Sequence, residues 1–103
     1  LKNTLLLQLE FNSFAAAKNL SASSLEVFPA QPVLYLLNAK ANNNLQGFKA
    51  AINALETGLD YLFDNAELEK EFYEQLAVAY TGQGNTIKAA NFAKKAAEIL
   101  DSN

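Results

Sequence analysis

Apolar residues recur every three or four positions along most of the chain, which is the spacing that places side chains on one face of a helix. Polar residues that end or begin helices interrupt this spacing at Asn12-Ser13, Gln46-Gly47 and Gly84-Asn85. A longer break at Phe28–Pro32 ends one helix and begins another, because a proline has no N–H to lose at a first helical position. The pattern predicts six helices, near residues 2–11, 14–27, 32–44, 48–62, 66–82 and 86–100.

Short sequence elements repeat within this pattern. Phe14-Ala15-Ala16-Ala17 aligns with Phe48-Lys49-Ala50-Ala51 at a distance of 34 residues. A third copy, Thr86-Ile87-Lys88-Ala89, follows 38 residues later, and the polar stretch Asp64–Glu67 accommodates the extra residues on a loop. Units of this size cannot bury an apolar face alone, so they stack on their neighbours. We therefore expect one all-α domain over residues 1–103, with repeats near 1–31, 32–65 and 66–103.

Small residues recur at one position of each unit. They indicate places where a second helix crosses closely, because a larger side chain would push the pair apart. Two sets lie seven residues apart on the same face, namely Ala17, Ala51 and Ala89, then Ser24, Gly58 and Ala96. An apolar stripe at helical spacing is expected to fill the space between the layers, and it consists of Leu20, Leu25, Ile52, Leu55, Leu59, Phe92 and Ile99.

These anchors resemble the tetratricopeptide repeat, a helix–turn–helix unit with a degenerate pattern of aromatic, small and turn residues. The third unit matches at Tyr73, Leu76-Ala77, Tyr80, Gly84, Ala89 and Ala96. The second unit matches at Tyr35, Ala39, Ala51, Leu55 and Gly58, but Asn38 and Asn42 replace the usual Leu and Tyr. The first unit keeps Phe14, Ala17, Leu25 and Pro29, but has Leu5 and Gln8 at unusual positions. The resemblance implies an α-solenoid of three stacked antiparallel helix pairs that form a right-handed superhelix.

The segment Val27–Pro32, followed by Tyr35, is similar to bacterial repeat proteins in which Leu-Phe-Pro-x-Gln-Pro precedes a tyrosine-rich helix. This resemblance implies a bacterial origin. The chain starts at Leu1 and contains no methionine, so we expect it to be a fragment of a longer protein.

Composition excludes several classes of function. Half of the residues are apolar and 18% are charged, which is typical of a globular chain. The net charge of −3 and the eight scattered basic residues argue against nucleic-acid binding. No apolar run approaches the ~20 residues that span a bilayer, so no membrane insertion is expected. The absence of histidine and cysteine removes the commonest general base, nucleophile and metal ligands, which predicts a non-enzyme without cofactor.

Three polar motifs leave a choice between a functional and a structural interpretation. Glu56, Asp60 and Asp64 recur every four residues and could form a paired-carboxylate or cation site, but a solvated helix face is favoured. Asn42-Asn43-Asn44 is either a polar recognition patch or a fraying helix end, and the sequence supports both equally. Gly82-Gln83-Gly84 is predicted to be a turn, because no strand precedes it and no Lys-Ser/Thr completes a phosphate loop.

The resemblance implies binding of a partner protein or peptide in a concave groove lined by the first helix of each pair. The predicted lining is Lys2, Leu6, Leu9, Glu10, Val33, Leu36, Lys40, Asn43, Asn44, Glu71, Glu74, Val78 and Thr81. Its apolar members, such as Leu36 and Val78, suggest an exposed docking surface. The alternative is that some of them belong to the core and that the true lining is shifted by one residue.

Chaperone-binding members of the family hold a C-terminal carboxylate with lysine, asparagine and arginine side chains on this lining. Leu6 and Lys40 stand where asparagines would be, and Glu74 and Val78 replace the basic pair. Glu74 would repel a carboxylate, so a mixed apolar–polar helix or an internal peptide segment is the expected guest.

A structural role without a groove ligand is the second hypothesis. Ala90, Phe92, Ala93 and Ala97 on the last helix form a packing surface suited to a further repeat. Either copies of the chain pair end to end through their terminal helices as a homodimer, or the array continues in the parent protein.

Overall fold

The computed structural model describes residues 2–99, with side chains from Glu10 onward. Over this range the chain is all-α and contains no strand, which confirms the all-α part of the prediction. The helices are α1 (Lys2–Val27), α2 (Pro32–Asn44), α3 (Phe48–Tyr61), α4 (Ala66–Gly82) and α5 (Thr86–Glu98). The bounds of α2 to α5 agree with the sequence pattern to within about two residues.

Asparagine side chains begin α4 and α5. Asn65 Oδ1 accepts a hydrogen bond from the Leu68 amide at 3.0 Å, and Asn85 Oδ1 accepts one from the Lys88 amide at 3.1 Å. Each bond satisfies one of the N–H groups that have no partner within the first helical turn.

The turns after α2 and α4 have the same hydrogen-bonding pattern. The Gly47 amide donates to the Asn42 carbonyl at 2.7 Å, and the Asn85 amide donates to the Tyr80 carbonyl at 2.9 Å. Each turn contains one residue in the left-handed region, Gln46 with φ 65° and Gly84 with φ 79°. This is a common way to end a helix, and it confirms the turn predicted at Gly82-Gln83-Gly84.

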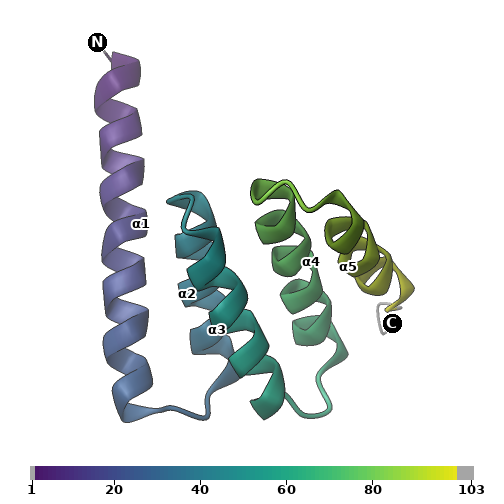
Figure 1. Ribbon diagram of the computed structural model, residues 1–103. Helices are drawn as coiled ribbons and strands as arrows, with labels where there is room; N and C mark the ends of the chain where they lie inside the picture. The colour runs from purple at the N-terminus through teal and green to yellow at the C-terminus, as the bar shows by residue number, and fades with distance from the viewer. Residues whose placement is uncertain (1, 100–103) are drawn as a thin grey trace.

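The break predicted at Asn12-Ser13 is wrong, because α1 runs without interruption over 26 residues and is the longest helix in Figure 1. In a helix interior, asparagine and serine each make the helical state less favourable than alanine by only about 0.5 kcal/mol, which is too little to end the helix. Neither residue adopts the left-handed conformation that Gln46 and Gly84 supply at the two hairpin turns. The first predicted helix pair is therefore a single helix.

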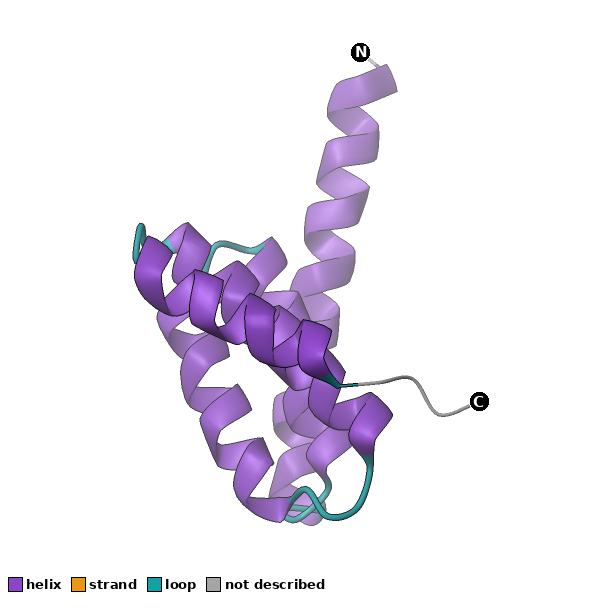
Figure 2. Cartoon of the chain, turned by 90° about the vertical axis from the view of Figure 1, so that its right-hand side faces the viewer, coloured by secondary structure: helices purple, strands orange, loops and turns teal. Residues whose placement is uncertain are grey.

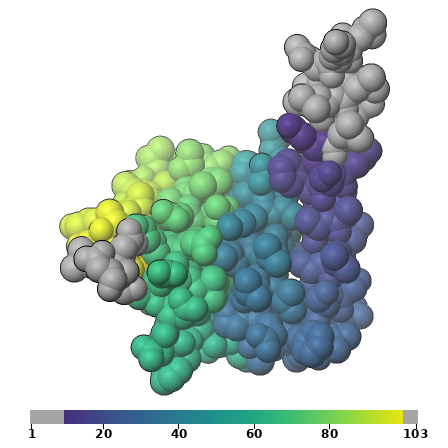
Figure 3. All heavy atoms as spheres, turned by 180° about the vertical axis from the view of Figure 1, so that it is seen from behind, coloured from purple at the N-terminus to yellow at the C-terminus, as the bar shows by residue number. Residues whose placement is uncertain are grey.

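Each helix packs against its neighbour in chain order, and α2 also contacts α4. The view turned by 90° shows the shorter helices grouped together while the N-terminal part of α1 extends beyond them (Figure 2). The space-filling view places α1 and α5 at opposite edges of the molecule (Figure 3). The core lies between α2, α3 and α4, where Leu55, Phe72 and Leu76 have exposed fractions of 1% or less.

Small residues mark the close helix crossings in α3 and α5, as predicted. Ala51, Gly58, Ala89 and Ala96 are buried. The same prediction is wrong for α1, where Ala17 is exposed and Leu20 has an exposed fraction of 70%. The reason is the missing turn, because without it no described helix covers this side of α1.

Candidate binding surface

Two side-chain contacts hold α2 beside α4. Lys40 Nζ forms an ion pair with Glu71 Oε1 at 3.1 Å. Asn43 Nδ2 donates to Gln75, at 3.2 Å to its carbonyl oxygen and at 2.9 Å to Oε1. Residues of α4 therefore lie level with residues 31 or 32 positions earlier on α2, so the two helices run in the same direction.

The exposed side of this helix pair carries both apolar and polar side chains. Val33, Leu37 and Val78 have exposed fractions of 45%, 48% and 47%. Polar residues at helical spacing surround them. We call this surface the α2/α4 face and define it by Val33, Leu37, Lys40, Asn44, Glu67, Glu71, Glu74, Val78 and Thr81.

Two residues of the predicted lining do not belong to this surface. Leu36 has an exposed fraction of 2% and Asn43 one of 7%, because both lie in the interface between α2 and α4. Leu37, one position after Leu36, is exposed instead. This is the one-residue shift that the sequence left open. The predicted Lys2, Leu6 and Leu9 lie outside the residues whose side chains are described.

The α2/α4 face has an acidic character on the α4 side. Glu67, Glu71 and Glu74 recur at helical spacing, and Lys40 is the basic residue opposite them on α2. Two other polar side chains turn back to their own helix, because Asn44 Nδ2 donates to the Lys40 carbonyl and Thr81 Oγ1 donates to the Ala77 carbonyl, each at 2.8 Å. The face therefore favours a ligand with apolar groups and positive charge.

Asparagines of α2 tie it to α1, a role that the sequence did not reveal. Asn38 Nδ2 donates to Ser21 Oγ at 3.1 Å and to the Lys18 carbonyl at 3.2 Å. Asn42 Nδ2 donates to Asn38 Oδ1 at 2.9 Å. Asn42 is therefore buried and positions Asn38 within α2, Asn43 is a buried link to α4, and the two form neither the recognition patch nor the fraying helix end considered above. Their Oδ1 atoms are buried without a hydrogen-bond partner.

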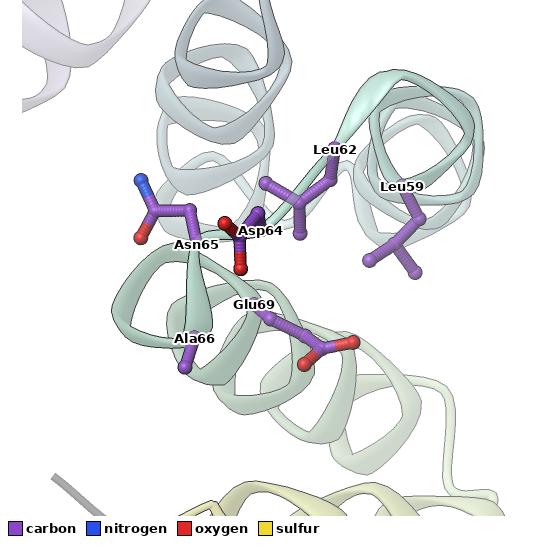
Figure 4. A pocket seen from close by; sticks show the side chains of 6 residues that line it. All are labelled: Leu59, Leu62, Asp64, Asn65, Ala66 and Glu69. Carbon is purple, nitrogen blue, oxygen red and sulfur yellow. The ribbon is translucent and has the colours of Figure 1, made fainter. Parts of the chain in front are cut away.

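A hollow of about 220 Å³ lies where α3 leads into α4, and Figure 4 shows Asp64, Asn65 and Glu69 at its wall. Asn65 is the cap of α4, and Glu69 Oε2 accepts a hydrogen bond from the Tyr73 hydroxyl at 3.3 Å. Burial and the neighbouring Glu69 carboxylate raise the pKa of Tyr73. These contacts account for the polar residues by helix capping and packing, without a ligand.

A larger hollow of about 510 Å³ lies beside α5. Its centre is formed by the stacked rings of Tyr80 and Phe92, whose centroids are 5.7 Å apart. The ammonium groups of Lys88 and Lys95 lie over these rings at 5.3 Å from Tyr80 and 5.2 Å from Phe92. Glu56 and Glu98 also line the hollow, so its charge is nearly balanced.

Glu56 and Asp60 are exposed on α3, which confirms the solvated helix face for these two residues, whereas Asp64 is exposed in the loop after the end of α3. Within the part of the chain whose side chains are described, no three acidic, histidine or cysteine residues gather as a metal site would require. Among residues 2–99, no helix is both long enough and apolar enough to cross a membrane.

Comparison with known proteins found no family model, no curated protein and no solved structure that matches the chain.

Proposed function

We propose that this chain is a non-catalytic protein-interaction module with a tetratricopeptide-like solenoid arrangement. The proposal is supported by the two helical hairpins α2–α3 and α4–α5, which share the same turn at positions 38 residues apart, Gln46 and Gly84. It is also supported by the way α1 meets α2. Phe14 lies near Asn44 at the end of α2, just as Phe48 lies against Gly82 at the end of α4.

The observation that carries the binding function is the exposed apolar pair Leu37 and Val78 on the α2/α4 face. Leu37 is level with residues 68–69 of α4, so Val78 lies nine or ten residues farther along. At ~1.5 Å per residue this separation is about 14 Å. The Lys40–Glu71 ion pair lies between the two apolar positions. A bound segment would therefore place an apolar side chain at each end and polar groups in the middle.

The acidic side of the face selects the charge of this segment. Glu67, Glu71 and Glu74 outnumber Lys40 and the neighbouring Lys70, so basic residues between the two apolar anchors would be attracted, and a terminal carboxylate would be repelled. In a helical ligand the anchors would be seven or eleven positions apart, because residues at these spacings share one helix face and are about 10.5 or 16.5 Å apart along the axis. In an extended ligand they would be about four positions apart. The expected partner is an internal basic segment of another protein.

Selection from a library of random peptides displayed on phage tests this function. The chain is immobilised, and the enriched peptides are then measured against wild type and a Leu37→Asp, Val78→Asp double variant. Both residues are about half exposed, so the variant is expected to keep its fold. The matched control is Ile87→Asp on α5, which changes a residue that is 75% exposed and does not belong to the α2/α4 face.

The expected result is enrichment of peptides with two apolar anchors around Lys or Arg, and a loss of affinity of about tenfold or more in the double variant only. Enriched peptides that bind the double variant with the same affinity as wild type would place the binding surface elsewhere. Failure to enrich any peptide would favour a structural role.

One observation supports that second candidate function, a segment of a longer repeat array. Ala90, Ala93 and Ala97 on α5 are exposed, although they lie at the helical spacing of a packing surface. A further helix of a longer array, or α5 of a second copy, would cover them.

A further inference from the structure

One side of α1 is apolar and uncovered. Leu20 and Val27 have exposed fractions of 70% and 68%, and the small residues Ala16 and Ala17 beside them are also exposed. The adjoining side of α1 contacts α2, where Ser21 is buried and accepts a hydrogen bond from Asn38. We call the uncovered side the outer face of α1 and define it by the exposed residues Ser13, Ala16, Ala17, Leu20 and Val27, with the half-buried Ser24 at its margin.

The 34-residue repeat shows what normally covers such a face. Ala17 and Ser24 of α1 correspond to Ala51 and Gly58 of α3, both of which are buried. At Gly58 the covering helix is α2, because a Cβ placed there would lie 2.7 Å from Cβ of Tyr35. The outer face of α1 therefore has the small residues that in α3 allow another helix to approach closely.

The start of this chain has a sequence that suits the covering helix but is held away from its own outer face. Residues 5–9, Leu-Leu-Leu-Gln-Leu, are strongly apolar. Because α1 is continuous through Asn12-Ser13, the segment before this point extends along the helix axis and cannot fold back on residues 14–27 of the same copy. In an antiparallel pair of α1 helices, the same segment of a second copy would lie along that face.

We infer that the outer face of α1 is a self-association surface, on which α1 of a second copy packs in antiparallel orientation about a two-fold axis near Ala16 and Ala17. This register places Leu20 of one copy opposite Ser13 of the other and Ala16 opposite Ala17, so large residues meet small ones. Val27 comes opposite the leucine-rich start of the second helix. No charged residue belongs to the outer face, so the two copies do not repel each other there.

The size of this contact sets its strength. With the two-fold axis between residues 16 and 17, residues 6–27 of the two α1 helices overlap over a length of about 33 Å at ~1.5 Å per residue. A strip ~10 Å wide along this overlap covers roughly 330 Å² on each copy, or about 660 Å² in total, which is below the ~1,000 Å² of a stable specific interface and is the size of a weak, transient contact. The pair is therefore expected to be reversible, with dimers at high micromolar protein and monomers at low micromolar protein. The α2/α4 face takes no part in the contact, so peptide binding and self-association can be measured independently.

Sedimentation equilibrium over this concentration range is the first measurement. Leu20→Glu should abolish the dimer, because it places a carboxylate opposite Ser13 in a closed contact. Leu20 is exposed in the single chain, so helicity measured by circular dichroism should not change. Ile87→Glu, at a residue that is 75% exposed on α5, is the matched control and should leave dimerisation unchanged. A chain that stays monomeric, or a Leu20→Glu variant that dimerises like wild type, would overturn the inference.

Cross-linking tests the orientation, and the absence of native cysteine makes single-cysteine variants unambiguous. With a short bis-maleimide, Ala16→Cys should cross-link to itself, because position 16 lies next to the two-fold axis. Val27→Cys should not, since the two copies of position 27 would be roughly 30 Å apart in the antiparallel pair. Cross-linking of Val27→Cys would indicate a parallel pair, and cross-linking of Ala90→Cys in place of Ala16→Cys would indicate association through α5. Either result would refute the proposed contact.

Discussion

Replacement of Gly58 by alanine tests the close packing of α2, α3 and α4 directly. Glycine in a helix interior is normally unfavourable, and alanine there should stabilise the helix by about 1 kcal/mol. At this position, however, the new Cβ would lie 2.7 Å from Tyr35 Cβ and 2.7 Å from Phe72 Cε1. Tyr35 Cβ is bonded to the backbone, so it cannot move away without a shift of α2, and the ring of Phe72 is fully buried and has little room to turn aside.

The cost of overpacking a core is about 1–3 kcal/mol, and the fixed position of Tyr35 Cβ places this site in the upper half of that range. After subtraction of the propensity gain, we expect Gly58→Ala to lower the free energy of unfolding by about 1–2 kcal/mol. The melting temperature should fall by roughly 4–16 °C, as measured by circular dichroism. Thr57→Ala is the matched control, because Thr57 is the exposed neighbour of Gly58 on the same helical turn. This variant should raise the free energy of unfolding by about 0.5 kcal/mol. If both variants stabilise the chain, the helices do not approach each other as closely as this reasoning requires.

Three further predictions concern the hairpin turns, the hydrogen bonds between α2 and α1, and the ionisation of Tyr73. Gln46→Gly should stabilise the chain by about 0.5–1 kcal/mol, because glycine adopts the φ of 65° at this position without strain. Gly84→Ala should destabilise the chain by a similar amount. Urea unfolding of both variants measures these changes in the free energy of unfolding. Asn38→Ala should lower the free energy of unfolding by about 1 kcal/mol and speed amide hydrogen exchange in α1, because it removes the hydrogen bonds to Ser21 and to the Lys18 carbonyl. Asn44→Ala, at an exposed position, is the control and should change neither quantity. In an ultraviolet titration Tyr73 should ionise above its ordinary pKa of 10.0, and Glu69→Gln should lower its pKa. Because the folded chain keeps this proton longer than the unfolded chain, the contribution of Tyr73 to stability is complete below pH 10 and is lost as the pH rises above it.

The helical pattern predicted α2 to α5 well because the signals there are chemically specific. Asn65 and Asn85 begin helices through their side-chain oxygens, and Pro32 and Gly84 stand at positions that suit their backbone preferences. Asn12-Ser13 resembles these signals only in polarity. It contains neither glycine nor proline, and neither of its residues adopts the left-handed conformation, so the helix continues through it.

The prediction of the lining residues was limited by register. Leu36 and Leu37 are both apolar, and their sequence positions cannot show which of them faces α4. The structure settles this through Lys40 and Asn43, whose contacts with Glu71 and Gln75 show which side of α2 is turned toward α4. Such contacts join residues about thirty positions apart, and helical periodicity within α2 contains no information about them.

The polar residues of α2 also explain how the helix is oriented. The family pattern has Leu and Tyr where this chain has Asn38 and Asn42, and an apolar pair could pack against α1 in more than one rotation. Hydrogen bonds from Asn38 to Ser21 on one side and from Asn43 to Gln75 on another fix a single rotation of α2. This rotation places Leu37 at the surface, since Leu36 must then face α4. The buried asparagines and the exposed apolar position are therefore linked. A change that frees α2 to rotate would alter the α2/α4 face even though no residue of that face had been replaced.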